Sequence, residues 1–215
     1  MTYLQLVNNV MRRLRENEVS TVNENAYSKL IGEYVNDAKR TVEDAWDWTA
    51  LRSTITVTTS DSSYNYTLTD SQNRLKVLNV INQTSNAFMK YRGSNWMDNA
   101  YLVDTAPEGI PTYYTFKGVD LGGRRIIKKY PKPDGVYSID FNVVLRTADF
   151  TADAQKLVIP PSAVIQLATA LSARERGETG GTSAAELFAL ADTTLADAIA
   201  IDASYHPEET IWNVV

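Results

Sequence analysis

The sequence predicts an α+β protein: a four-helix bundle made of two helical hairpins, an inserted antiparallel β-sandwich or barrel-like domain, and an extended C-terminal tail. Apolar residues recur at helical spacing before residue 52 and after residue 160. Between them lie short runs rich in β-branched and aromatic residues, separated by turn residues. We therefore expect a helical bundle domain from residues 1–52 and 157–204, a β domain from 53–156, and a docking tail from 205–215.

The composition fits a globular protein and excludes several classes of function. Of the 215 residues, 44% are hydrophobic and 22% charged, which is enough to bury a core. The net charge of −5 argues against non-specific nucleic-acid binding by bulk charge. Cysteine is absent, which excludes disulfides, thiolate metal sites and cysteine catalysis. The chain shows no signal-peptide pattern and no transmembrane run, so we expect a soluble protein without a membrane partner.

The first hairpin begins with an amphipathic helix from Thr2 to about Asn17, with Thr2 as its N-cap. Its last turns carry three arginines, whose charge suits the helix dipole. They also allow a contact with phosphate or an acidic partner, which we regard as the less favoured interpretation. These arginines are Arg12, Arg13 and Arg15.

A long amphipathic helix follows from Ala26 to Arg52, about 39 Å at ~1.5 Å per residue. Its apolar positions recur at spacings of three, four and seven, and it ends in the aromatic pair Trp46 and Trp48. The connection before it offers Ser20, Thr21 and Asn23 as capping groups. A connection this short predicts an antiparallel pair of helices.

The inserted region predicts seven or so short strands and one short helix. The strands are expected at 54–58, 64–69, 75–83, 87–92, 113–118, 124–130 and 137–146, and the helix at 94–101. Turn signals at close intervals favour a small sandwich or barrel over a parallel sheet.

One of these strands concentrates positive charge. Two interpretations stay open: contact with DNA or an acidic partner, or protection of an edge strand against unwanted pairing. The basic residues are Arg124, Arg125, Lys128, Lys129 and Lys132.

The second hairpin begins at Pro160-Pro161, because proline suits the first turn of a helix. Its first helix ends near Gly177, and a further helix runs from Ser183 to Ser204. The glycines of this connection predict a turn rather than a phosphate-binding loop, because no Gly-Lys-Ser/Thr follows. Three aspartates of the last helix are expected at exposed positions and not in a metal cluster: Asp192, Asp197 and Asp202.

The chain ends with apolar side chains beyond a helix break at His206-Pro207. Burying such side chains supplies about 1.5–3 kcal/mol each, so the tail either folds back on its own domain or docks on another chain. The residues concerned are His206, Ile211, Trp212, Val214 and Val215.

Signatures of an enzyme are missing from the sequence. It has one histidine and no nucleophile elbow, zinc motif, P-loop or dinucleotide fingerprint, and we expect no cofactor. Glu43, Asp44 and Asp47 lie beside the tryptophans, where paired carboxylates could serve glycoside hydrolysis. A second alternative is a carbohydrate-binding module, in which aromatic rings stack on sugar. Its candidate residues are Trp96, Tyr113 and Tyr114.

The order of these elements, with several local stretches, resembles a known family. The stretches are AWDWTALR, KYRGSNW, YPKPDGVYSIDFNVVL, IPPSAVIQLATALSARERGE and DAIAIDASYHPEETIW. Together they are similar to the head-to-tail adaptors, or connectors, of short-tailed bacteriophages, such as the tail tubular protein A family. The resemblance covers nearly the whole chain and includes no catalytic motif.

This resemblance implies a structural virion protein of the neck, made in the host cytoplasm, and no enzyme. It implies a homo-oligomeric, commonly dodecameric, ring that binds the portal protein on one side and the tail nozzle or tail tube on the other. Tail fibres can attach to such a ring, and genomic DNA passes through it without sequence-specific binding. The family's C-terminal segment reaches the portal, which corresponds to residues 206–215 here.

Overall fold

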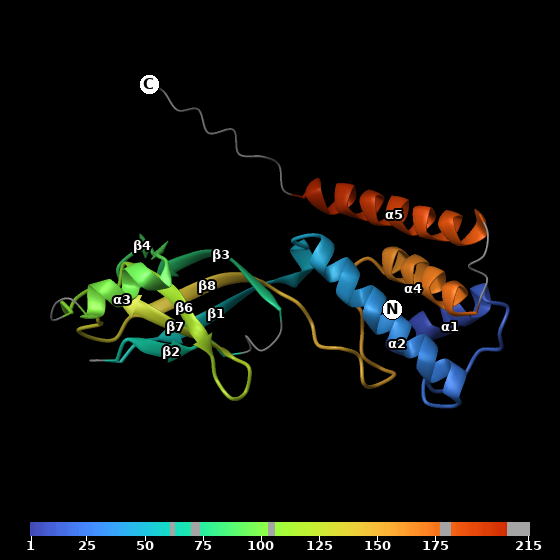
Figure 1. The fold of residues 1–215 in the computed structure, drawn as a ribbon, viewed down its shortest axis with the longest axis horizontal. Coiled ribbons are helices and arrows are strands. Elements are labelled where there is room, and N and C mark those ends of the chain that lie inside the picture. The colour runs from blue at the N-terminus through green and yellow to red at the C-terminus, as the bar shows by residue number, and fades with distance from the viewer. Residues whose placement is uncertain (61–62, 70–73, 103–105, 177–181, 206–215) are drawn as a thin grey trace, which may run out of the picture. The chain divides into compact units, whose positions relative to one another are not determined.

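A computed structural model describes residues 1–60, 63–69, 74–102, 106–176 and 182–205. In this part the chain is α+β, with five α-helices and two β-sheets, as expected (Figure 1). It divides into two compact units, a helical unit of Met1–Leu51 with Ala148–Val215 and a β unit of Arg52–Thr147. Among the described residues, no helix is both long and apolar enough to cross a membrane.

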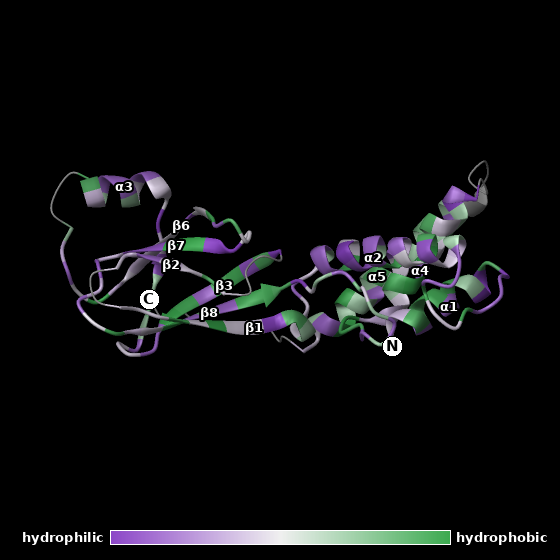
Figure 2. Cartoon of the chain, turned by 90° about the horizontal axis from the view of Figure 1, so that it is seen from below, coloured by the Kyte–Doolittle hydropathy of each residue, from purple (hydrophilic) through white to green (hydrophobic). Residues whose placement is uncertain are grey.

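The helical unit contains α1 (Tyr3–Arg13), α2 (Ala26–Ala45), α4 (Pro161–Glu175) and α5 (Thr182–Ala203). Helices α1, α2 and α4 pack against one another, and α5 packs on α4. The apolar stripes predicted from spacing face this core, while α2 turns hydrophilic residues outward (purple in Figure 2). Fully buried side chains of the core include Leu6, Val7, Val10, Ile31, Val35, Ala38, Val164 and Ala168.

Helix α1 begins as predicted and ends earlier than predicted. The Thr2 hydroxyl accepts a hydrogen bond from the Gln5 backbone N–H, and the Gln5 side chain accepts one from the Thr2 N–H. The helix ends at Arg13, and Arg15 adopts a φ of 60°, which turns the chain out of the helix direction. Helix α2 is capped by Asn25 with Ser28, and not by the residues expected from the sequence.

The long helix was predicted to reach Arg52, and this prediction is wrong. Helix α2 stops at Ala45 because Trp46 is extended, with φ −149° and ψ 159°. The indole N–H of buried Trp48 then donates to the Val42 carbonyl at 2.7 Å, which satisfies one of the free acceptors at the helix end. A single 3₁₀ turn, Thr49–Leu51, leads into the first strand.

The β unit has two four-stranded sheets. The first has the order β1 (Arg52–Thr58), β8 (Ser138–Leu145), β3 (Leu75–Asn82), β4 (Ala87–Phe88), and all its pairs are antiparallel. The second has the order β2 (Asn65–Thr67), β7 (Arg125–Tyr130), β6 (Tyr113–Val119), β5 (Lys90–Tyr91). Because β5 pairs with β6 in parallel, the second sheet is mixed and not purely antiparallel as predicted.

One hydrophobic core joins the two sheets. Ile55, Ile139 and Phe141 come from the first sheet, and Tyr114 and Ile127 from the second. Figure 2 shows hydrophobic residues along β3 and β8. Alternation along each strand places one set of side chains in this core and the other set outside it.

Candidate functional site

The three carboxylates proposed from the sequence for hydrolysis do not share one environment. Glu43 is completely buried on α2, whereas its neighbour Asp44 is exposed and Asp47 lies half-buried beyond the helix. A carboxyl group that exchanges protons with a substrate must reach it, and Glu43 faces the protein interior instead. The hydrolase alternative therefore has no support.

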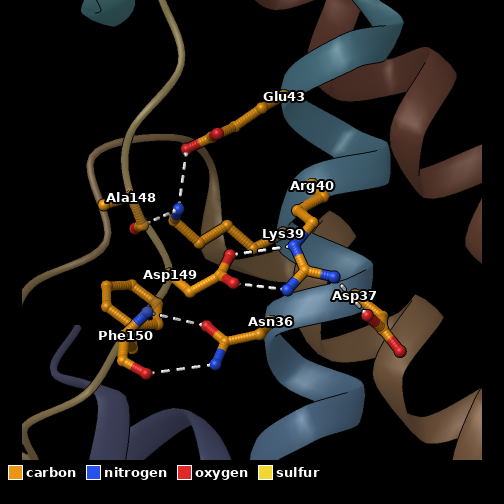
Figure 3. A network of polar contacts seen from close by, with 8 residues as sticks. All are labelled: Asn36, Asp37, Lys39, Arg40, Glu43, Ala148, Asp149 and Phe150. Carbon is orange, nitrogen blue, oxygen red and sulfur yellow. Dashed lines mark hydrogen bonds and ion pairs between the residues drawn. The ribbon is translucent and has the colours of Figure 1, made fainter. Parts of the chain in front are cut away.

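Glu43 belongs to a buried ion pair. Its Oε1 lies 3.3 Å from Nζ of Lys39, one helical turn earlier, and both side chains are fully excluded from solvent (Figure 3). The Lys39 ammonium also donates to the Ala148 carbonyl at 2.8 Å and lies 5.2 Å from the centre of the Phe150 ring. A buried charge needs such partners to offset the water it has lost.

The same face of α2 holds the following residues of the returning chain (Figure 3). The Asn36 amide donates to the Phe150 carbonyl at 3.1 Å and accepts from the Phe150 N–H at 2.9 Å. Arg40 donates from Nε to Asp149 at 2.9 Å, and its guanidinium also contacts Asp37 at 2.8 Å. Helix α2 therefore fixes the segment at which the chain re-enters the helical unit.

A second buried acid joins the ends of two helices. One Asp202 oxygen accepts hydrogen bonds from the Trp46 indole N–H at 3.0 Å, the Thr49 N–H at 3.1 Å and the Thr49 hydroxyl at 3.2 Å. Asp202 was predicted to be exposed on α5, and this is wrong, because it packs against the turn that follows α2. It fixes the C-terminal end of α5 to residues 46–49 of the same unit.

The basic stretch does not form a single charged patch. Strand β7 lies between β2 and β6, so the prediction of an edge strand is wrong. Lys128 is buried, with its ammonium 2.8 Å from Asp98 and 4.5 Å from the centre of the Tyr101 ring.

Three other basic residues of this stretch lie nearer the surface. Arg124 and Arg125 are exposed, with Arg124 paired to Asp120 at 2.8 Å. Lys132 pairs with Glu108 at 3.0 Å.

Lys129 points in the opposite direction from Lys128 and is fully buried. Its ammonium lies 4.1 Å from the centre of the Tyr66 ring, and in the described part of the chain it has no hydrogen-bond partner. Burial lowers the pKa of Lys129 from 10.5 to about 7, because desolvation disfavours the charged form. This lysine cannot serve a surface contact without leaving its site.

The aromatic residues proposed for sugar binding are occupied by one another. Trp96, on α3 (Ser94–Leu102), lies 5.2 Å from Tyr113 and 5.4 Å from Tyr130 between ring centres. The Arg92 guanidinium lies 5.3 Å from the Trp96 ring and 5.0 Å from the Tyr113 ring, and Tyr114 is buried in the core. Stacking on a sugar needs an open ring face, so this arrangement does not support the carbohydrate alternative.

Residues 206–215 of the predicted docking tail lie outside the described residues, as do the glycines between α4 and α5. The tail residues concerned are His206, Ile211, Trp212, Val214 and Val215.

The sequence matches the family model of the SU10 adaptor protein over residues 1–209. The chain belongs to this family. The match confirms the resemblance to phage head-to-tail adaptors and makes the chain a structural phage adaptor protein of the virion neck. No curated protein matches the chain.

The described residues of this adaptor contain no group of three or more histidine, cysteine, aspartate or glutamate side chains placed to hold a metal ion. Several of its charged residues act instead in packing, and this role of Lys39 and Glu43 was not predicted from the sequence. Lys39 and Glu43 have the i, i+4 spacing of a helical ion pair, which was visible in the sequence. Their burial was not visible, because residues 148–150, which cover them, are more than a hundred positions away.

Proposed function

We propose that copies of this adaptor form a ring, dodecameric as in the family it resembles, that joins the portal to the tail nozzle or tail tube of a short-tailed phage. The observation that carries the proposal is the match to an adaptor family over residues 1–209, because it includes both units and not one shared fold element. The genome passes through the centre of the ring, and tail fibres attach to it.

The proposal gives each part of the chain a task. The four long helices act as one bundle that builds the ring, and the β unit faces the nozzle or the fibres. The tail from residue 205 onward docks on the portal through Ile211, Trp212, Val214 and Val215, next to His206. Support for the tail comes from its apolar composition, because a tryptophan and three aliphatic side chains gain free energy when they are buried.

Charge supports passage of DNA rather than retention. Phosphate binding requires clustered cations, and the chain has a net charge of −5. Within the basic stretch, Lys128 and Lys129 are buried, so a contact with a partner falls to the exposed Arg124 and Arg125.

The test is the mass of the assembly, measured by light scattering on a sizing column. The purified adaptor is run alone and then with rings of the portal protein that is encoded with it. We expect a complex that contains adaptor and portal in equal copies. An adaptor that leaves the portal rings unchanged at micromolar concentrations of both would contradict the proposal.

A further inference from the structure

Helix α5 is covered on one side only. Its buried residues Ala191, Ala198 and Asp202 face α4 and the end of α2. Beside this buried stripe, Leu190 and Ile201 are 48% and 62% exposed. A helix with exposed large aliphatic side chains beside its buried stripe presents a surface that gains free energy when a partner covers it.

The charges of α5 are of one sign. Between Thr182 and Ala203 the sequence has four carboxylates and no lysine or arginine. Asp202 is used internally, whereas Glu186 and Asp197 are exposed. Their spacings of four and seven residues place them with Leu190 and Ile201 on one face, here called the outer face of α5. A helix face that only meets water usually mixes both signs. A partner of this face must therefore carry positive charge, and the aliphatic stems of arginine side chains can also cover the exposed leucine and isoleucine.

The same chain carries a matching surface at the C-terminal end of α1. Arg12, Arg13 and Arg15 are all exposed there. Arg12 lies 3.2 Å from Glu18, and Arg13 donates to the uncharged Gln166 side chain at 2.5 Å. Glu16, the residue after Arg15, is paired with Arg176 at 2.5 Å, so the cluster keeps a positive excess. Figure 1 shows α4 between α5 and α1 within the helical unit. One copy therefore cannot bring its own two surfaces together.

We propose that the outer face of α5 in one copy docks on the arginine-bearing end of α1 in the next copy. The contact joins two different surfaces, so each copy keeps one free surface of each kind and the chain of contacts can close into a ring. Pairing of α5 with α5 is disfavoured because it opposes carboxylates with carboxylates. The inference deepens the proposed ring and rests on it.

Charge reversal tests the contact directly. The acidic-face variant is Glu186→Lys with Asp197→Lys, and the basic-end variant is Arg13→Glu with Arg15→Glu. Each is expected to abolish adaptor–adaptor assembly, measured as scattering mass with and without portal rings. A single chain that carries all four substitutions restores assembly, because both surfaces have exchanged sign. The matched control for net charge is Glu33→Lys with Asp44→Lys on α2, which is expected to assemble normally.

Cross-linking gives a readout that does not depend on charge. The chain has no cysteine, so Ala196→Cys on α5 and Asn17→Cys beside Arg15 introduce the only thiols. Under a short bismaleimide, the variant with both thiols is expected to give a ladder of multimers. Each variant with one thiol is expected to remain monomeric on a denaturing gel.

The outcomes separate this inference from the proposed function. The α5–α1 contact is overturned if both reversal variants still assemble with the portal, or if the Ala196→Cys variant forms dimers on its own. Either result is compatible with the proposed ring. Loss in each reversal variant with recovery in the combined one supports the contact. If the unaltered chain forms no assembly with portal rings at all, the proposed function fails and the contact fails with it.

Discussion

Removing the charge of Glu43 tests whether the Lys39–Glu43 pair is as deeply buried as the structure shows. In the variant Glu43→Gln, the Lys39 ammonium keeps the Ala148 carbonyl at 2.8 Å and the Phe150 ring but loses its counter-charge. Breaking one partner of a buried pair costs about 3–5 kcal/mol. Because the glutamine oxygen can still accept a hydrogen bond, we expect a loss near the lower limit, about 3 kcal/mol.

The measurement is thermal unfolding followed by the helical circular-dichroism signal, together with hydrogen exchange of peptides from α2. A loss of about 3 kcal/mol corresponds to a fall in Tm of roughly 10 °C for a domain of this size. The matched control is Asp44→Asn, which removes the same charge from the adjacent, exposed position. It is expected to change stability by less than about 0.5 kcal/mol.

A double variant identifies the cause of the loss. Lys39→Met with Glu43→Leu removes both charges and leaves the Ala148 carbonyl without its donor, at a cost of about 1 kcal/mol. It is therefore expected to be more stable than Glu43→Gln alone. If the two prove equally unstable, or if Glu43→Gln matches Asp44→Asn, the reasoning from an unpaired buried charge is refuted.

Three further predictions follow from other parts of the molecule. Burial holds the pKa of Lys129 at about 7. Between about pH 7 and pH 10 the unfolded state therefore binds one more proton than the folded state. As the pH rises through this range, the free energy of unfolding of the β unit increases by up to about 1.4 kcal/mol per pH unit. Hydrogen exchange of β7 measures this pH dependence, and we expect Lys129→Met to abolish it. If the variant keeps the same pH dependence, another titratable group causes it. Asp202→Ala removes the acceptor of the Trp46 and Thr49 hydrogen bonds, so exchange should quicken in residues 46–51 and at the end of α5. Asp197→Ala, exposed on the same helix, should leave the exchange of both segments unchanged. Equal exchange in the two variants would show that Asp202 fixes nothing. Deleting residues 211–215 should leave the melting curve intact and abolish portal binding on the sizing column; full portal binding by the shortened chain would remove the tail from the proposed interface.

The local elements were largely predictable because they depend on neighbours in the sequence. The spacing of Leu6, Val7 and Val10 indicated the buried face of α1, and Thr2 marked its start. β-Branched runs indicated β1 and β8, and Pro161 marked the start of α4. The family resemblance was also carried by local stretches, and the match over residues 1–209 confirms it.

The tertiary structure alone decided which charged residues are exposed. A sequence pattern assigns lysine and aspartate to the surface by default, since burying a charge is expensive unless it is paired. Lys39, Lys129 and Asp202 escape this rule because residues distant in the chain cover them. These are the segment 148–150 for Lys39, Tyr66 of the neighbouring strand β2 for Lys129, and the turn after α2 for Asp202. The sequence by itself therefore determined the periodic elements and the adaptor family, whereas long-range packing determined which charges hold the molecule together and which remain free for a partner.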